Sequence, residues 1–548
     1  MKPNILFVNM LSIPMDYIRE SFIGRNETYE ALAMPLGILY LSSYIKKHNN
    51  VGEVAALDYV LNLKHILKYR DIDDFILRTA AESVGFTPHI LAFSLNYSSA
   101  HKFFLLCSEK LKSLWPNALS IVGGNHATNA FKFFLQNPKV DYVCRGEGEI
   151  PLSEFIRQYS AGEKISVKGF YSKKDLDARD TFEPAELIRN LDEIPFPDWD
   201  IVNMGEYVAG KGRRRSIGKA ANSKLASLLT TRGCPYKCTF CSSFTVHGNR
   251  VRYRSTENII AEMKLLHEKY GVTLFIPDDD LFTAKKSRFL EMLAAIRNLK
   301  IPDFEIQLPS ALRVNDLDDD VIDALVETGL RITYIAIESG DDYVQKHIIR
   351  KNVDLKKAVH AVRRLQSKGI VVRCYFIFGF PGETKEQMQQ TVDYARGLGA
   401  DWCGFIIATP LIGSPMYDQF VEMGSIPEDF CLQADSFFLR RQFDTPEISA
   451  AELNEFAYRS NLDINFINNH NKVAGQYENA IALYRDIVET YPFHIIGWYC
   501  IMECQRLLGN LDEAAETEKT ILNLIRADRR AQKMCEKYGD LMPDLRMD

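Results

Sequence analysis

Short runs of apolar residues alternate with longer stretches of helical pattern through most of this chain. Five such runs lie within residues 1–162, and six more lie within residues 223–425. A short apolar run followed by a helix is typical of a parallel sheet, because parallel strands must be joined by a crossover connection that is usually a helix. The alternation therefore predicts an α/β fold. Since 548 residues exceed what a single core accommodates, two or three domains are expected.

The first group of runs predicts a doubly wound, Rossmann-like domain over residues 1–162. A helix is expected to begin near Pro35, since proline is favoured in the first turn of a helix. In such sheets ligands bind outside the carboxyl ends of the strands. Gly123 and Gly124 follow one of these ends, where they would let the backbone approach a bulky ligand, although a glycine pair can also form a simple turn. The expected strands are Ile5–Val8, Val54–Leu57, Ile90–Leu95, Leu119–Val122 and Tyr142–Val143.

Three cysteines in the middle of the chain, Cys234, Cys238 and Cys241, have the spacing Cys-x3-Cys-x2-Cys. Three thiolates this close together can hold three irons of a [4Fe–4S] cube and leave the fourth iron without a protein ligand. Zinc and inert thiols are the alternatives. Zinc is disfavoured, because it prefers four ligands in two pairs and no second CxxC pair exists in the chain.

This spacing, with Phe240 directly before the last cysteine, resembles the radical SAM superfamily. The resemblance implies that S-adenosylmethionine chelates the open iron, and that an electron from a donor such as a flavodoxin or ferredoxin releases a 5′-deoxyadenosyl radical. It also implies a partial (β/α)6 TIM-type barrel over residues 223–425, with the active site at the carboxyl ends of the strands. The expected strands are Ala226–Thr230, Leu274–Ile276, Glu305–Leu308, Thr333–Ile337, Val371–Phe378 and Gly404–Ala408.

Polar residues follow several of these barrel strands. The resemblance implies that Asp279 holds the amino group of S-adenosylmethionine and that Glu338 holds its ribose. Each has a purely structural role as its alternative. For Asp279 the reason is that three successive carboxylates usually form a solvated turn or a helix cap. The remaining residues that the resemblance assigns to S-adenosylmethionine are Phe240, Arg373, Gly379 and Glu383, and the loop 409–415 is expected near the substrate. A capping-box pattern predicts a helix from Thr384 to Leu398, and Cys374 and Cys403 are expected to be packed hydrophobic residues.

An ordered set of short motifs in the first domain resembles the cobalamin-binding domain of the B12-dependent radical SAM class. The residues that this resemblance assigns to cobalamin are Leu36, Gly37, Ser94, Gly123, Gly124, His126, Glu147, Gly148 and Glu149. Many such domains supply an axial histidine two residues after an aspartate, but Val60 occupies that position after Asp58. Cobalamin is therefore expected to bind without a histidine on cobalt, and His126 is expected to be a loop residue. A degenerate domain that binds nothing is the alternative.

The remaining segments are a linker over residues 163–222, with Pro195, Pro197 and Trp199, and a helical tail over residues 426–548. In the tail, the motif at 475–480 recurs at 509–514, and this period of 34 residues resembles tetratricopeptide repeats. Two repeats rarely fold alone, so the tail is expected to pack on the barrel or on a protein partner. Cys500 and Cys504 are expected to be buried at that face.

Composition and charge narrow the possible partners and the cellular location of the protein. A net charge of −6 argues against nucleic acid as a partner. The basic cluster Lys211–Arg215 is either a solvated loop or a contact for a substrate phosphate or carboxylate. No apolar run approaches the length of a membrane span, and no signal peptide is recognised. Eleven cysteines without a disulfide framework favour a cytoplasmic protein.

These features predict a cobalamin-dependent radical SAM enzyme. The resemblance implies methyl transfer, with methylcobalamin as the donor, to an unactivated carbon, or less often phosphorus, of a small metabolite, lipid or peptide. The first alternative within the class is cyclisation, ring contraction or oxidation without methyl transfer. A methylthiotransferase is disfavoured, because it needs three more cluster cysteines upstream and only Cys107 and Cys144 exist there. A cobalamin and iron–sulfur sensor or scaffold is the alternative outside enzymology.

Overall fold

The computed structural model describes residues 1–24, 33–209, 223–433 and 440–545. The basic cluster Lys211–Arg215 lies outside the described residues. The chain divides into two compact units. The first contains the described residues up to 310 together with 409–433, and the second contains 311–408 together with 440–545.

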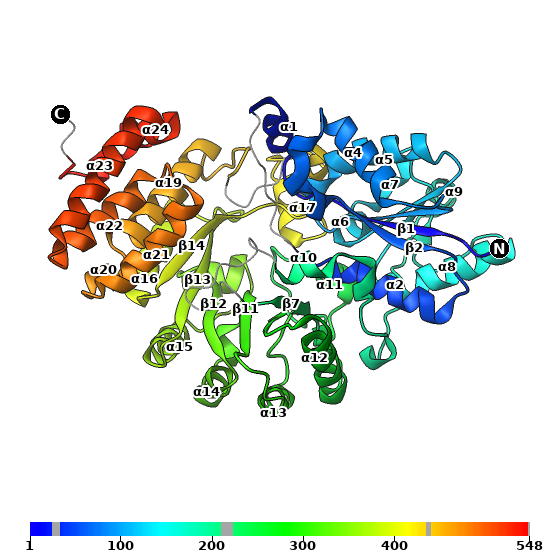
Figure 1. Ribbon diagram of the computed structural model, residues 1–548, viewed down its shortest axis with the longest axis horizontal. Helices are drawn as coiled ribbons and strands as arrows, with labels where there is room; N and C mark the ends of the chain where they lie inside the picture. Colours follow the sequence, from blue (N-terminus) through cyan, green and yellow to red (C-terminus); the bar gives the residue numbers. More distant parts are fainter. Residues whose placement is uncertain (25–32, 210–222, 434–439, 546–548) are drawn as a thin grey trace. The chain divides into compact units, whose positions relative to one another are not determined.

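A six-stranded sheet with the order β2-β1-β3-β4-β5-β6 forms the centre of the first unit (Figure 1). All neighbouring strands are parallel except β6, which runs antiparallel to β5. The order reverses between β1 and β3, the point at which doubly wound sheets bind their ligands. The strands are β1 (Ile5–Asn9), β2 (Val54–Asp58), β3 (Ile90–Ser94), β4 (Leu119–Gly123), β5 (Tyr142–Cys144) and β6 (Phe170–Tyr171).

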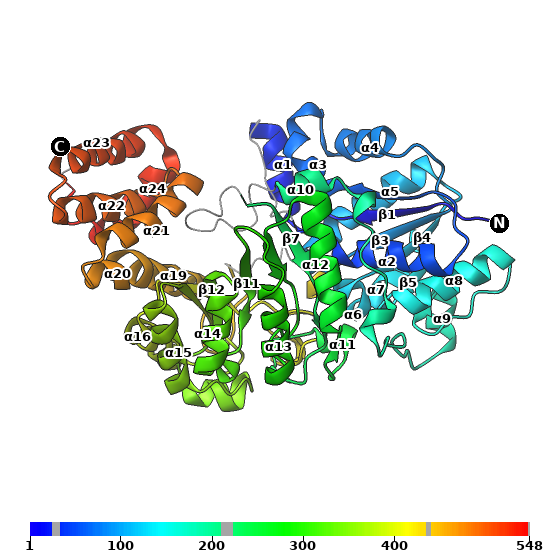
Figure 2. The same ribbon diagram turned by 60° about the horizontal axis from the view of Figure 1, so that its bottom comes forward.

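Helices cover both faces of this sheet, as Figures 1 and 2 show. Helices α2 (Leu36–His48) and α8 (Glu149–Ala161) pack on one face, where Ile38 and Phe155 join the buried side chains of the strands. On the other face, α5 (His101–Leu114) packs Phe104 edge-on against Phe93 of β3. The other helices here are α1 (Met15–Gly24), α3 (Tyr59–Asn62), α4 (Ile72–Ser83), α6 (Asn125–Asn129), α7 (Phe131–Gln136), α9 (Lys173–Ala178) and α10 (Met204–Val208).

The first unit also contains three neighbouring parallel strands of a second sheet. These are β7 (Leu225–Leu228), β10 (Leu274–Pro277) and β11 (Glu305–Leu312), of which β11 belongs to this unit as far as Ser310. Leu274 lies opposite both Leu225 and Glu305. A short antiparallel pair, β8 (Thr231–Arg232) and β9 (Arg252–Tyr253), follows β7. The associated helices are α11 (Phe244–His247), α12 (Thr256–Tyr270), α13 (Lys286–Arg297), α17 (Pro415–Glu422) and α18 (Phe430–Gln433).

The second unit contains parallel strands β12 (Leu330–Glu338), β13 (Val371–Phe378) and β14 (Trp402–Ile407). Helix α14 (Asp319–Glu327) precedes β12, while α15 (Leu355–Ser367) and α16 (Lys385–Leu398) connect the three strands. Thr384 and Gln387 form the predicted capping box of α16. Cys374 and Cys403 are buried in these strands, as expected.

The tail forms a helical layer in the second unit (Figure 2). Gly475 and Gly509 both have positive φ and each precedes a helix by two residues, at equivalent positions of the 34-residue repeat. Cys500 and Cys504 are fully buried in the core between the tail helices. The helices are α19 (Ala450–Leu462), the π-helix η8 (Asp463–Ile467), α20 (His470–Val473), α21 (Tyr477–Thr490), α22 (Ile495–Leu507), α23 (Leu511–Ala527) and α24 (Arg529–Tyr538).

The predicted fold class is confirmed, and the predicted strands agree with the structure to within a few residues. Two differences concern boundaries. The segment 163–222, expected to be a linker, contributes β6 to the first sheet, and residues 426–433 belong to the first unit rather than to the tail.

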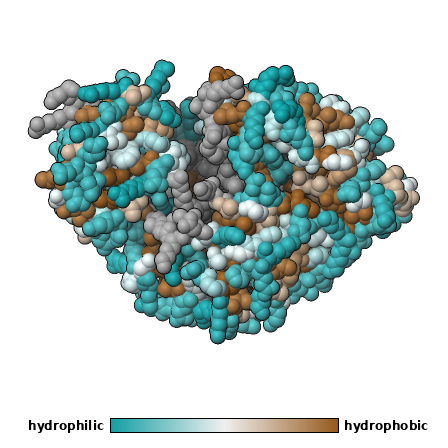
Figure 3. All heavy atoms as spheres, in the orientation of Figure 1, coloured by the Kyte–Doolittle hydropathy of each residue, from teal (hydrophilic) through white to brown (hydrophobic). Residues whose placement is uncertain are grey.

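Polar and apolar side chains are intermixed on the face in Figure 3. Within the described residues, no helix is long and apolar enough to cross a membrane.

Candidate functional site

A cavity of about 590 Å³ lies in the first unit, at the carboxyl ends of the strands of the first sheet. Asn9, Ser94 and Gly123, the last residues of β1, β3 and β4, line it. Val60 also lines the cavity, at the position where an axial histidine would be required. Of the residues assigned to cobalamin by resemblance, the structure brings eight together around this cavity, namely Leu36, Gly37, Ser94, Gly123, Gly124, Glu147, Gly148 and Glu149.

Two glycines shape the cavity wall in different ways. Gly124 has a φ of +106°, and a Cβ atom there would lie 2.4 Å from the carbonyl oxygen of Leu95, so only glycine fits. Gly37 lies in helix α2, and a Cβ atom there would have no neighbour within 4 Å. The first glycine is thus required by the fold, whereas the second keeps space open beside the cavity. A wall of this kind suits a large flat ligand such as a corrin ring.

His126 is placed differently from our expectation. It lies in helix α6 rather than in a loop, and its side chain does not line the cavity. The imidazole is buried, with Nδ1 3.1 Å from the Ser98 hydroxyl and Nε2 3.3 Å from Nδ1 of His101. Burial lowers the pKa of His126 to about 3 and that of His101 to about 4, so both rings are neutral.

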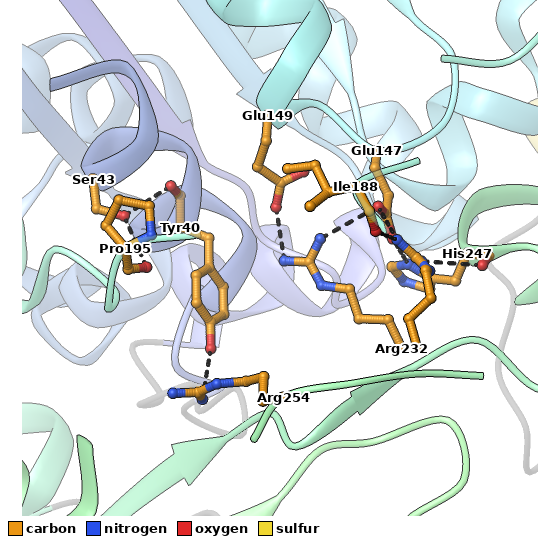
Figure 4. A network of polar contacts seen from close by, with 10 residues as sticks. Tyr40, Ser43, Glu147, Glu149, Ile188, Pro195, Arg232, His247 and Arg254 are labelled. Carbon is orange, nitrogen blue, oxygen red and sulfur yellow. Dashed lines mark hydrogen bonds and ion pairs between the residues drawn. The ribbon is translucent and has the colours of Figure 1, made fainter. Parts of the chain in front are cut away.

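Glu147 and Glu149 line the cavity but are already paired with side chains of the segment around the cysteines (Figure 4). Glu149 accepts a hydrogen bond of 2.7 Å from Arg232. Glu147 accepts two from Arg252, at 2.8 and 2.6 Å, and lies 2.8 Å from Nδ1 of His247. Burial alone would raise the pKa of Glu147, but these hydrogen bonds and the charge of Arg232 hold it well below its usual range.

The three cysteines of the predicted cluster site lie in the loop that follows β8. Gly233, directly before Cys234, has a φ of +90° and donates its backbone N–H to Asp280 at 2.8 Å. Asp280 also accepts a hydrogen bond from the Ser243 hydroxyl, so one carboxylate holds both ends of the loop. This loop therefore has a defined backbone frame in the protein itself.

The exposure of the thiols distinguishes this loop from the rest of the chain. Cys234, Cys238 and Cys241 are partly exposed, whereas the other eight cysteines are buried. Three accessible thiols on one short loop are a donor set that suits a [4Fe–4S] cluster with one open iron. In the described part of the chain, no group of three or more His, Cys, Asp or Glu side chains is already arranged as a metal site.

Asp279 follows β10 as predicted, but its carboxylate is engaged within the fold. It accepts hydrogen bonds from the backbone N–H groups of Thr230 and Thr231, at 2.6 and 3.0 Å, and from the Thr230 hydroxyl. Burial raises its pKa to about 6. These contacts fix the corner between β7 and β8. The neighbouring Asp278 lines the cavity, which the sequence did not single out.

Glu338 has the strained geometry often found at functional sites. It ends β12, has a φ of +69° although it is not glycine, and is 6% exposed. Its carboxylate lies 2.6 Å from Nζ of Lys351. Arg350 and Asn352, on either side of this lysine, also have positive φ. The strand-end position and the strain both favour a binding role for Glu338.

Gly379 and Glu383 form a closed turn after β13. Oε2 of the fully buried Glu383 accepts hydrogen bonds from the N–H groups of Gly379 and Phe380, at 2.6 and 3.0 Å. Arg441 donates to the carbonyl oxygens of Gly379 and Ala408 and so joins the ends of β13 and β14. Burial raises the pKa of Glu383 to about 8, against the opposing effect of the two N–H groups and of Arg441.

Arg373 and Phe240 are the last two residues that the sequence assigned to S-adenosylmethionine. Arg373 lies near the start of β13 rather than at its carboxyl end, and its guanidinium is 3.7 Å from Asp486 on α21. The assignment of Arg373 to S-adenosylmethionine stays a prediction. Phe240 is partly exposed beside Cys241. Phe240 and Asp279 belong to the first unit, and Glu338, Arg373, Gly379 and Glu383 belong to the second.

Sequence reasoning missed Tyr40, Arg232, His247 and Arg252 as residues of the site. Tyr40 lines the cavity, with the Arg232 guanidinium over its ring at 5.3 Å and Arg254 3.5 Å from its hydroxyl. The only indication in the sequence that such partners exist was the charge of two glutamates. Glu147 and Glu149 are charged residues in a glycine-rich loop at a buried strand end, and such carboxylates need cationic partners.

Comparisons with known proteins agree with this geometry. A family model described as Radical SAM superfamily matches residues 228–395, and one described as B12 binding domain matches residues 25–156. An uncharacterized methyltransferase of Pyrococcus horikoshii is 30% identical over 71% of this chain and 78% of its own length. Cytidylyl-2-hydroxyethylphosphonate methyltransferase of Streptomyces wedmorensis is 26% identical over 72% of this chain and 79% of its own. Anaerobic magnesium-protoporphyrin IX monomethyl ester cyclase of Cereibacter sphaeroides is 27% identical over 70% of this chain and 60% of its own length.

Solved structures show the same fold. The cobalamin-dependent S-adenosylmethionine radical enzyme OxsB, with aqua-cobalamin and S-adenosylmethionine bound, has a TM-score of 0.65 at 16% identity, covering 99% of this chain and 84% of its own. The radical S-adenosylmethionine methyltransferase TsrM of Kitasatospora setae has a TM-score of 0.57 at 18% identity, covering 77% and 78%.

The fold and the site thus define a radical SAM enzyme whose barrel is preceded by a domain for a corrinoid. The chain belongs to the radical SAM superfamily, within the group that also carries a B12-binding domain. The predicted partial (β/α)6 barrel is confirmed with this assignment. The cofactors of the enzyme are a [4Fe–4S] cluster, S-adenosylmethionine and cobalamin.

Proposed function

We propose that this enzyme transfers a methyl group from S-adenosylmethionine, by way of cobalamin, to an unactivated carbon, or less often phosphorus, of a small metabolite, lipid or peptide. The observation that carries the proposal is the hydrogen bond of 2.7 Å between Arg232, two residues before the first cysteine, and Glu149 in the cavity wall. It joins the cluster loop to the corrinoid cavity within one compact unit. The two relatives named methyltransferases, each matched over more than three quarters of its length, support it.

The residues have separate tasks in this proposal. Cys234, Cys238 and Cys241 hold three irons of the cluster, and the glycine-lined cavity holds the corrin ring. When bound, the cluster with S-adenosylmethionine supplies the radical and cobalamin carries the methyl group. Glu338, Gly379 and Phe240 are our proposed contacts for S-adenosylmethionine. Asp279 fixes the corner after β7 in the first unit, and Glu383 fixes the turn after β13 in the second, because their oxygens accept backbone hydrogen bonds.

The proposal can be tested before the substrate is identified. Protein reconstituted anaerobically with iron, sulfide and cobalamin is reduced and supplied with S-adenosylmethionine carrying a deuterated methyl group. We expect S-adenosylhomocysteine to be released, the deuterated methyl group to be recovered with the extracted corrinoid, and 5′-deoxyadenosine to be formed. Cys234→Ala should lose 5′-deoxyadenosine formation while retaining cobalamin.

Two other outcomes would replace the proposal. Formation of 5′-deoxyadenosine without label in the corrinoid would favour cyclisation, the reaction in the name of the Cereibacter relative, or else ring contraction or oxidation. Absence of both 5′-deoxyadenosine and S-adenosylhomocysteine from fully loaded protein would indicate a sensor or scaffold.

The proposal extends to partners and location. A flavodoxin or ferredoxin would supply the electron, and the tetratricopeptide-like repeats of the tail would offer a surface for a protein partner. A cytoplasmic location is supported by the cysteines, since the spacing of the eleven shows no disulfide framework and eight of them are buried.

A further inference from the structure

We propose that Arg232 is a positioning residue that couples cobalamin binding in the cavity to assembly of the cluster on the cysteine loop, with Glu147 and Glu149 as its partners. The inference rests on the proposed function, because it takes the cavity as the cobalamin site and the loop as the cluster site. It assigns the two glutamates to the link between the sites rather than to direct contact with cobalamin.

The contacts of Arg232 connect three elements of the first unit. Its guanidinium donates to Glu149 at 2.7 Å and lies 3.6 Å from Glu147 (Figure 4). The carbon of the guanidinium also lies 5.3 Å from the centre of the Tyr40 ring. Glu149 begins helix α8, and Tyr40 lies in helix α2. Both side chains line the cavity, as Arg232 itself does. Arg232 is only 6% exposed, so water screens these interactions weakly.

A second arginine strengthens the same link. Arg252 is directly opposite Arg232 in the β8–β9 pair. It binds Glu147 through two hydrogen bonds and donates to the carbonyl oxygen of Ile188 at 2.8 Å. His247, which lies between the cysteine loop and β9 in the sequence, is held by the same carboxylate at 2.8 Å. The planar fork of arginine gives such contacts direction, which lysine cannot reproduce.

The consequence is a thermodynamic linkage between two cofactor sites. Arg232 is separated from Cys234 by a single glycine whose backbone is fixed by Asp280. A cluster on the loop would hold Arg232 in place, and Arg232 would then hold the glutamate loop in the form that lines the cavity. Coupling of this kind is reciprocal, so cobalamin must favour the cluster by the same factor.

The experiment is a pair of titrations on the full chain. Hydroxocobalamin is titrated by absorption spectroscopy into protein freed of iron with a chelator and into protein carrying the reconstituted cluster. For the wild type we expect cobalamin to bind about tenfold more tightly when the cluster is present. The measured quantity is the ratio of the cobalamin dissociation constant without the cluster to that with it. In Arg232→Gln and in Glu149→Gln this ratio should fall to about one, while each protein still binds both cofactors. Arg232→Lys should give an intermediate ratio.

Arg157→Gln is the matched control, because Arg157 also binds two carboxylates and lies on α8, but is exposed. Its ratio should equal that of the wild type. A wild-type ratio of one, or an unchanged ratio in folded Arg232→Gln or Glu149→Gln, would overturn the inference. If Arg232→Gln does not fold, Arg232→Lys and Glu149→Gln decide the question. Failure of the wild type to bind cobalamin or iron would instead contradict the proposed function.

Discussion

Cysteine exposure separates residues with different roles. Anaerobic reconstitution of the wild type should give about four irons and four sulfides per chain. Cys234→Ala, Cys238→Ala and Cys241→Ala should each lose this iron, because each removes one of three partly exposed thiols. Cys374→Ala and Cys403→Ala are the controls, since both thiols are buried in strands, and they should keep the full iron content. Stoichiometric zinc with no iron in the wild type would contradict the assignment.

Two glycines of the cavity offer a matched pair of alanine variants. Gly124→Ala should destabilise the protein by about 1–3 kcal/mol, because its Cβ would clash with the Leu95 carbonyl at positive φ. Gly37→Ala should keep or raise stability, since alanine favours helices and no atom lies within 4 Å of the new Cβ. Its methyl group should nevertheless weaken cobalamin binding about tenfold by crowding the ligand. Unchanged affinity in Gly37→Ala would show that the corrin ring does not approach α2.

Glu383 should make stability depend on pH. Its carboxyl is buried, and its pKa rises from 4.5 to about 8 in the folded protein. Between these values the folded state binds more protons than the unfolded state, so its contribution to stability falls as the pH rises and is lowest above pH 8. Glu383→Gln removes this penalty and keeps an oxygen for the N–H groups of Gly379 and Phe380. We expect it to raise the unfolding free energy by on the order of 2 kcal/mol at pH 8, with a gain that disappears toward pH 5 in denaturant titrations. An equal gain at both pH values would show that burial of the charge is not the cause.

At the scale of the elements, a helix of the tail completes the outer strand of the barrel. Asn465, in the π-helix η8, accepts from the N–H of Cys403 at 2.7 Å and donates to its carbonyl oxygen at 2.6 Å. One side chain thus takes the place of a neighbouring strand on β14. Asn469 and Asn471 extend the contact by donating to Asp401 at 3.2 and 2.9 Å.

Asn465→Ala should therefore be costly. It leaves a buried N–H and a buried carbonyl without partners, and we expect the unfolding free energy to fall by about 2–3 kcal/mol. Asn479→Ala on the exposed face of α21 is the control and should change stability by less than about 0.5 kcal/mol. Equal effects of the two substitutions in thermal denaturation would show that Asn465 does not hold the strand edge.

The regular elements could be predicted because their signals are local. Apolar runs marked the central strands, and a capping box marked α16. The strand β6 has only two residues, which is too short for a recognisable apolar run, and it is defined by its pairing with β5. The partners of Glu147 and Glu149 could not be predicted from the sequence for a related reason. Arg232 lies 83 residues from Glu149, and only the folded chain brings them together. Sequence motifs therefore located the residues of the site but not the roles that their partners impose.

At the scale of the whole molecule, the tail is part of the second unit rather than a separate module. Its core includes Leu462, Phe466 and Tyr484, and Trp402 of β14 packs edge-on against Phe466 at 5.4 Å. Arg373 of β13 and Asp486 of α21 form a further contact at 3.7 Å. The aromatic contact and the ion pair both join tail helices to strands of the second unit.

Truncation tests whether this packing is required. A chain that ends at residue 439 should be largely insoluble or unfold at much lower temperature, because β14 loses both its polar edge contacts and its apolar cover. Cofactor content provides the discriminating measurement. If the tail serves only a protein partner, the truncated chain should remain soluble, with the melting temperature and the iron and cobalamin content of the full chain. We expect instead that it loses them together, and that Asn465→Ala shows a milder form of the same defect, since one side chain provides only part of the cover.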